Sequence, residues 1–172
     1  MARRRVEREL ALQLAYAMDR TGDGFEDARF RFIQVDPRRR KAWGPYAERL
    51  ASETAQHREE IDQRLRSVLQ HWRLERLSAI DRAILRLAAC ELMRFAEIPS
   101  RVTINEFIEI ARRYGNDDSP AFVNGVLDAI ARDYPQKDYQ LEPHGEEANG
   151  KKNRKLGEKG PNANNRQGCA PR

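Results

Sequence analysis

Four arginines lie within the first eight residues, at Arg3, Arg4, Arg5 and Arg8. A guanidinium group is permanently charged, binds phosphate through two parallel N–H groups and stacks on unpaired bases. Tyr16 follows on the same predicted helix, where its ring offers a further stacking surface. These residue types favour contacts with nucleic acid, through its phosphates and unpaired bases.

The same arginines could instead form a solvated helix end, and on the residues alone the two interpretations are equally good. Cations at a helix N-terminus oppose the helix dipole and cost roughly 0.3–1 kcal/mol each when exposed. Stability alone would favour Asp or Glu at these positions. The arrangement therefore favours a partner that carries negative charge.

A second candidate site is the stretch from Tyr114 to Phe122, where Asp117 and Asp118 precede a predicted helix start. Backbone N–H groups at such a start can hold phosphate. Ordinary capping by Asp118 or Ser119, with Phe122 in the core, explains the pattern better on the residues alone.

The residues that could perform catalysis do not form a reactive pattern. The histidines at positions 57, 71 and 144 have no Cys or carboxylate partners at metal-ligand spacing. Cys90 lies in an apolar segment and Cys169 in a polar one, without the spacing of a disulfide framework. No glycine-rich phosphate loop is present, and Gly125 suggests close helix packing instead. We therefore expect no enzyme activity, no metal and no cofactor.

Charge and hydropathy indicate the kind of partner and the compartment. Lys and Arg number 32 against 27 Asp and Glu, for a net charge of +5, which suits an acidic partner. No apolar run approaches the roughly 20 residues of a membrane span, and no signal peptide is recognisable. We expect a cytoplasmic protein without a membrane partner.

Apolar residues recur every three or four positions, which predicts helices over about 3–19, 45–72 with a break near His57, 77–98, 103–115 and 119–134. Residues 25–42 are ambiguous. In the first helix Val6, Leu10, Leu14 and Ala17 form the expected core stripe, with Arg4 and Arg8 pointing almost opposite. Thr103 and Glu106 are expected to form a capping box.

The fold class is therefore all-α, a compact bundle of six to seven helices joined mostly by short loops. Residues 1–136 form the predicted helical RNA-binding domain. Residues 137–172 are rich in Gly, Asn, Lys and Glu, so we expect a disordered polar and basic tail.

Four segments resemble the NusB family of bacterial transcription antitermination factors. They are Arg4-Arg5-x-x-Arg8-Glu9-x-Ala11-Leu12-Gln13-x-x-Tyr16, then 84–92 (ILRLAACEL), 98–111 (IPSRVTINEFIEIA) and 122–128 (FVNGVLD). They stand in the family's order and spacing and cover about half of the chain. The combination is specific, although each piece alone would be weak.

The resemblance implies an all-helical fold of two packed subdomains. It implies that the chain pairs with ribosomal protein NusE, binds the single-stranded boxA element of nascent ribosomal RNA and acts on RNA polymerase. By the same resemblance Arg4, Arg5 and Arg8 contact RNA with Tyr16 nearby. Asp118 and Phe122 match a region beside the RNA, and Asp81 matches an acidic position that faces NusE.

The chain departs from the family pattern in three places. Residues 22–43, with the basic run from Arg38 to Lys41, have no aligned counterpart, Pro120 and Ala121 replace a polar and often basic pair, and the tail after Pro135 is an extension. These departures leave the RNA preference open.

Two other functions are compatible with the sequence. One is a NusB-like domain that serves an RNA methyltransferase, for which we expect no catalytic half after Pro135. The other is a helical protein–protein adaptor, or a homodimer, without specific RNA binding. A homodimer of this kind would hide the RNA surface.

Overall fold

The computed structural model describes residues 2–70 and 72–134, except for the side chain of Ala2, and all of them belong to one compact unit. The predicted domain boundary at residue 136 and the predicted tail lie outside the described residues. The described helices are α1 (Ala2–Thr21), α2 (Phe25–Val35), α3 (Pro37–Ala42), α4 (Pro45–Gln56), α5 (Arg58–Val68), a 3-10 turn (Leu74–Arg76), α6 (Ala79–Arg94), α7 (Ser100–Tyr114) and α8 (Ser119–Ala131).

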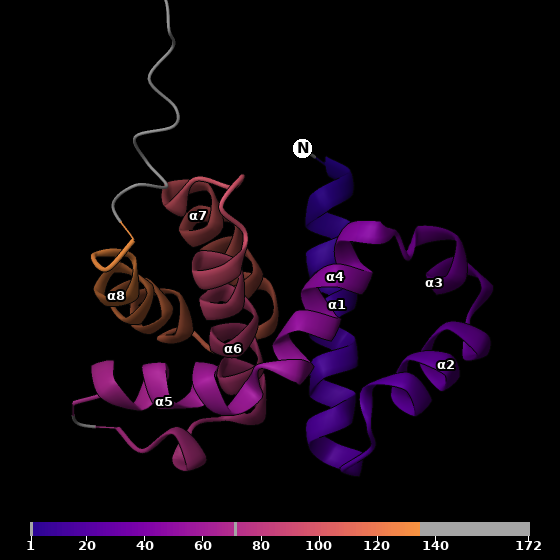
Figure 1. Cartoon of the computed structure of the whole chain (residues 1–172), viewed down its shortest axis with the longest axis horizontal. Helices are drawn as coiled ribbons and strands as arrows, with labels where there is room; N and C mark the ends of the chain where they lie inside the picture. The colour runs from indigo at the N-terminus through magenta and orange to yellow at the C-terminus, as the bar shows by residue number, and fades with distance from the viewer. Residues whose placement is uncertain (1, 71, 135–172) are drawn as a thin grey trace, which may run out of the picture. The chain divides into compact units, whose positions relative to one another are not determined.

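The helices pack in two groups (Figure 1). In the first group α1 contacts α2, α3 and α4, and in the second α6 contacts α5, α7 and α8. Contacts of α6 with α1 and α4 join the groups. The predicted all-α fold is confirmed, and no strand occurs in the described ranges.

Helix α6 is central because nearly every side is apolar, and its residues from Ala83 to Leu92 are all buried. Cys90 is fully buried there, as expected, and burial raises the pKa of its thiol to about 12. The break near His57 is also confirmed, since α4 ends at Gln56 and α5 begins at Arg58.

The ambiguous segment 25–42 folds into two helices, which brings the number of α-helices in the described part to eight. Phe32 and Ala28 anchor α2 in the core. Asp36 then caps α3, where its carboxylate accepts from the backbone N–H of Arg38 at 2.9 Å, and Pro37 occupies the first turn.

The core stripe predicted for α1 is partly wrong. Leu10 and Leu14 are buried, but Val6 is 45% exposed, whereas Arg8 is only 2% exposed. Because α1 is covered by α4 and α6 together, its buried arc is wider than one stripe and includes polar side chains that find partners inside.

The partner of Arg8 is Glu91 of α6, which is fully buried. Nε and Nη2 of Arg8 donate to the two carboxylate oxygens at 2.9 and 2.7 Å. The hydroxyls of Tyr46 in α4 and Thr103 in α7, the latter at 2.8 Å, also donate to Glu91. One carboxylate therefore joins α1, α4, α6 and α7, and the expectation that Arg8 points away from the core is wrong.

A second ion network fixes the other end of α1. Asp19 accepts from Arg82 and Arg86 of α6 at 2.9 Å and from Arg58 of α5 at 2.9 Å, and Arg86 also holds Asp62. Burial favours a higher pKa for Asp19, but the hydrogen bond from Arg82 and the nearby guanidinium charges hold that pKa below its usual value.

Glu7 of α1 caps the start of α4. Its Oε2 accepts from the backbone N–H groups of Tyr46 and Ala47 at 2.9 and 3.0 Å, where α4 has no side-chain cap of its own. A Cβ on Gly44 would lie 2.5 Å from the same carboxylate. Glycine is therefore needed at position 44 for Glu7 to reach the helix end.

The predicted capping box at Thr103 and Glu106 is wrong. Helix α7 begins three residues earlier, at Ser100, so Thr103 lies inside the helix and turns to Glu91. Glu106 reaches Arg5 of α1 instead. Two residues with the spacing of a local cap thus serve as long-range partners.

Replacing Glu91 with Gln should lower the free energy of unfolding by about 3–5 kcal/mol, because Arg8 would remain buried without its counter-charge. Urea unfolding measures the change. The control is Glu109→Gln, which breaks an exposed pair with Arg112 and should cost less than about 1 kcal/mol. Equal losses in the two variants would contradict the structural role of the buried pair.

Gly44→Ala should destabilise the fold by roughly 1–3 kcal/mol, since the new Cβ displaces Glu7 and the α4 cap is lost. Gly125→Ala provides a control of opposite sign. A Cβ at Gly125 meets nothing within 4 Å, contrary to the close packing expected there, and Ala favours the helix by roughly 0.5–1 kcal/mol. Thermal unfolding of both variants checks the pair, and a neutral Gly44→Ala would count against the cap.

Candidate nucleic-acid interface

The first turn of α1 presents three exposed arginines, Arg3, Arg4 and Arg5, which we call the arginine patch. The turn contains no acidic residue, so the patch stands against the helix dipole, as the sequence suggested. The side chain of Arg3 is 80% exposed and lies 3.3 Å from Glu7. Within the described ranges no carboxylate is at ion-pair distance from Arg4, whose guanidinium lies 5.6 Å from the Tyr46 ring centroid.

Arg5 is held on the surface by Glu106 of α7. Its Nε and Nη2 donate to the two carboxylate oxygens at 2.9 and 2.7 Å, and its side chain remains 44% exposed. The hydrogen bond and charge of Arg5 hold the pKa of Glu106 below its usual range. The pair orients the guanidinium without burying it.

Arg8 lies behind the patch. Its guanidinium is 5.1 Å from the Tyr46 ring centroid and 3.6 Å from Glu106, in addition to the bonds to Glu91. Of the four predicted RNA-binding arginines, the structure thus leaves three at the surface and uses one inside. One signal could have revealed this: a carboxylate at Glu91, inside an unbroken apolar run, requires a buried cation.

Helices α1 and α7 meet along a polar seam. One turn after Arg5, Glu9 accepts from Arg113 at 2.9 Å and from the Tyr114 hydroxyl at 3.1 Å. Tyr16 follows two turns later on α1 and is 39% exposed. Arg5 and Tyr16 therefore border this seam, about 17 Å apart along the helix, whereas Arg3 lies beside Glu7 and Arg4 lies beside the Tyr46 ring of α4.

The remaining predicted residues, Asp81, Asp118 and Phe122, meet in one hollow of about 390 Å³ between α6, α8 and the 3-10 turn. Exposed Trp72 packs edge-on against Phe122, with ring centroids 6.0 Å apart. Asp118 is exposed and occupies the N-cap position of α8, but its side chain makes no capping hydrogen bond, so the predicted alternative of a side-chain cap by Asp118 is wrong. The side-chain oxygen of Asn116 accepts from the backbone N–H groups of Asp118 and Ser119.

Asp81 is the most unusual member of this hollow. It is 7% exposed, and its Oδ2 accepts from the hydroxyl of Ser78 at 2.7 Å. Its other carboxylate oxygen is buried and has no hydrogen-bond donor in the described part of the chain. A donor from outside the chain would satisfy it. Sequence reasoning had separated Asp81 from Asp118 and Phe122, and the structure brings them together.

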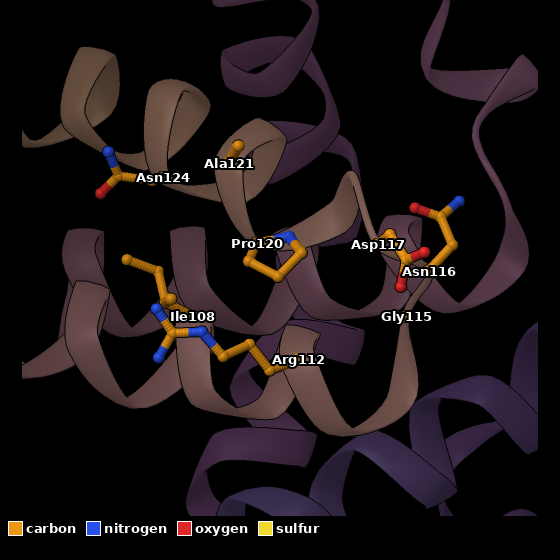
Figure 2. A pocket seen from close by; sticks show the side chains of 8 residues that line it. All are labelled: Ile108, Arg112, Gly115, Asn116, Asp117, Pro120, Ala121 and Asn124. Atoms are coloured by element: carbon orange, nitrogen blue, oxygen red, sulfur yellow. The ribbon is translucent and has the colours of Figure 1, made fainter.

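A second hollow, of about 530 Å³, lies between α7, the turn that follows it and the start of α8. Figure 2 shows Pro120 and Ala121 on α8 above Arg112 of α7, with Asp117 at the connecting turn. The two positions at which the chain departs from the family pattern thus face this hollow and bring no charge to it.

The described residues offer neither a metal site nor a membrane-spanning helix. No group of three or more His, Cys, Asp or Glu side chains there is placed to hold a metal ion. None of the helices in those ranges is long and apolar enough to cross a membrane.

A cationic helix end, with an exposed aromatic side chain further along the same helix, is a combination that nucleic-acid-binding proteins use. The sequence model of the NusB family matches residues 5–132. The chain belongs to the NusB family.

Relatives of known function and structure agree with this assignment. The transcription antitermination protein NusB of Anaeromyxobacter dehalogenans is 43% identical over 135 residues, which span 78% of this chain and 94% of the relative. The T. maritima NusB structure has 33% identity and a TM-score of 0.70, covering 80% of this chain and 97% of its own. A chain from a crystal structure of antitermination factors NusB and NusE in complex with dsRNA shares the fold, with a TM-score of 0.66 at 24% identity over 78% of this chain and 99% of its own.

Removing Arg5 should raise the pKa of Glu106 toward its usual value, because Arg5 supplies the largest contribution that lowers it. A depressed carboxylate pKa stabilises the fold above the unfolded-state value, and this contribution is lost as the pH falls through the folded-state value. Carbon-detected NMR titration of Glu106 in Arg5→Ala measures the shift. Arg113→Ala, which breaks the neighbouring pair with Glu9, is the control and should leave Glu106 as in the wild type. An unchanged Glu106 titration in Arg5→Ala would contradict the pairing.

Proposed function

We propose that this chain is a transcription antitermination factor that binds boxA-like single-stranded RNA in nascent ribosomal RNA transcripts together with ribosomal protein NusE. Family membership supplies the antitermination role. The single observation that carries RNA binding is the arginine patch, three exposed cations on a helix turn where stability alone would favour acidic residues.

In this proposal the patch contacts the phosphate backbone. Arg4 pairs with no carboxylate among the described residues, and Arg5 exchanges Glu106 for a phosphate. Because exposed ion pairs contribute only about 0.2–1 kcal/mol, the exchange costs little. Tyr16 stacks on an unpaired base further along the seam. Arg8 does not contact RNA but positions α1, since releasing it would leave Glu91 buried and unpaired.

Asp118 and Phe122 form the second RNA contact. The exposed carboxylate of Asp118 can accept from a base amino group or a ribose 2′-hydroxyl, and the half-buried ring of Phe122 can stack on a base beside Trp72. The fold neighbour in complex with NusE and dsRNA offers a precedent for RNA and protein on one such fold.

Asp81 is the proposed contact to NusE. Its Oδ1 has no donor among the described residues and would accept most favourably from a cationic side chain of a partner that enters the hollow. The complex of this chain with NusE would then join the RNA polymerase antitermination complex.

One observation supports a second candidate function. Trp72 is 61% exposed beside Phe122, and exposed aromatic side chains around a hollow are typical of protein–protein contacts. The chain would then be an adaptor, or a homodimer, that binds no specific RNA.

Fluorescence anisotropy with labelled boxA-like single-stranded RNA, across a salt series and with NusE present or absent, tests the proposal. We expect tighter binding with NusE and a log–log salt slope that falls by roughly 0.7 for each lost phosphate contact in Arg4→Ala with Arg5→Ala. The matched control is Arg132→Ala, an exposed arginine at the end of α8. A duplex of the same sequence should bind more weakly than the single strand.

An unchanged slope in the double variant would remove the arginine patch from the RNA interface. If the wild-type chain binds NusE but binds no RNA, the adaptor function is favoured instead. Sedimentation of the free chain and of its RNA complex gives the stoichiometry. If a dimer persists with RNA bound, the homodimer does not hide the RNA surface.

A further inference from the structure

A separate hollow of about 370 Å³ opens between α1, α2, α3, α6 and α7, a size within the range of roughly 300–1,000 Å³ usual for small-ligand sites. Five helices supply its walls. The lining residues are Leu12, Gln13, Tyr16, Ala17, Phe32, Arg39, Ile80 and Tyr114.

The aromatic walls of this hollow are held in place from behind. The Tyr114 hydroxyl donates to Glu9 at 3.1 Å. Phe32 is 8% exposed and packs edge-on against Trp43, with ring centroids 5.8 Å apart. Tyr16 remains 39% exposed at the rim. Fixed aromatic rings lose little entropy when a flat ligand stacks on them.

Arg39 brings a positive charge to the same hollow. Its guanidinium lies 4.4 Å from the Phe32 ring centroid, close enough for a cation–π contact. No carboxylate in the described ranges lies at ion-pair distance from Arg39. A charge oriented by an aromatic ring, with no acidic partner among those residues, suits a ligand that combines a π-face with a negative group.

The rest of α3 extends this charge over the surface. Arg38, Arg40 and Lys41 are exposed on the same short helix, and only Arg38 has an acidic neighbour in the described part, Asp36 at 3.4 Å. These residues form the basic run that lies outside the four segments of the resemblance, although the family model spans it within residues 5–132. A nucleotide fits both features, because its flat base suits the aromatic walls of the hollow and its phosphate suits the positive charges of α3.

We infer that this hollow binds one unpaired base of the RNA and that α3 binds the adjacent phosphates, so that the RNA path continues from the arginine patch along α1 onto α3. The inference rests on the proposed function. It adds Arg39 and α3 as a specific RNA-binding site of this chain. The base stacks between Tyr16 and the Phe32–Arg39 pair, and a single-stranded region is required because a paired base cannot enter.

The test is an abasic scan in the presence of NusE. A set of single-stranded RNAs carries the boxA-like core with extensions on either side, and one base at a time is replaced by an abasic nucleotide. Each RNA is titrated against the wild type, Arg39→Gln and Tyr16→Ala, with Arg132→Ala as the control for loss of one exposed arginine.

We expect a single position outside or at the edge of the core where loss of the base weakens wild-type binding. Arg39→Gln should weaken binding of the intact RNA roughly 2- to 30-fold and lower the salt slope by roughly 0.7, and Tyr16→Ala should weaken it roughly 5- to 150-fold. At that one position the abasic RNA should bind the wild type and Tyr16→Ala with nearly equal affinity, since the stacking is already lost. Arg39→Gln should lose less affinity for this abasic RNA than for the intact RNA, since only its phosphate contact remains to be lost. Arg132→Ala should follow the wild type at every position.

Wild-type affinity of Arg39→Gln for all RNAs would overturn the inference. The inference would also be overturned if the fold losses from Arg39→Gln and from base removal simply multiply at every position. If Arg39→Gln changes only the affinity for NusE, the hollow belongs to the protein partner and the inference is likewise overturned. If Arg4→Ala with Arg5→Ala weakens RNA binding while Arg39→Gln does not, the proposed function stands and only this site fails. If the wild type binds no RNA even with NusE, both fail.

Discussion

The buried pair of Arg8 and Glu91 ties the first helix of this chain to the central one, and the position of every proposed RNA contact depends on it. Removing two charges from water is unfavourable unless their remaining hydrogen-bonding groups are satisfied. Here the hydroxyls of Tyr46 and Thr103 complete the coordination of the carboxylate. Because these groups come from α1, α4, α6 and α7, the pair can form in only one arrangement of the two helical groups. That arrangement brings Arg5, at the start of α1, within reach of Glu106 on α7.

The arginines of α1 therefore divide into two functions within two turns. Arg8 is neutralised inside and sets the helix in place, while Arg3, Arg4 and Arg5 are exposed and Arg5 reaches α7. Glu106 contacts both sets, since it pairs with Arg5 and lies near Arg8. The buried network thus orients the exposed charges. A ligand that took Arg5 from Glu106 would leave the buried pair intact.

Periodicity was sufficient to predict the fold class, the central helix and the break near His57, because each depends on local spacing of apolar residues. It failed where long-range partners decide. A helical wheel assigns Arg8 to the solvent, since it has no means of locating Glu91, which lies 83 residues further along the chain. The spacing of Thr103 and Glu106 suggested a cap for the same reason. Residues 25–42 were ambiguous because α2 and α3 are short and depend on packing against α1. The arginines and Tyr16 were candidates from their residue types, whereas Asp81 came from the resemblance alone. The meeting of Asp81, Asp118 and Phe122 in one hollow could not be read from spacing.

The division between structural and binding arginines is tested most directly by NMR of the arginine Nε–Hε groups during titration with boxA-like RNA and NusE. The account predicts that the signals of Arg4 and Arg5 shift with RNA concentration. It predicts that the Arg8 signal stays in place and remains protected from exchange with water, because its bond to Glu91 persists. A shift or loss of protection at Arg8, with Arg4 and Arg5 unchanged, would contradict it.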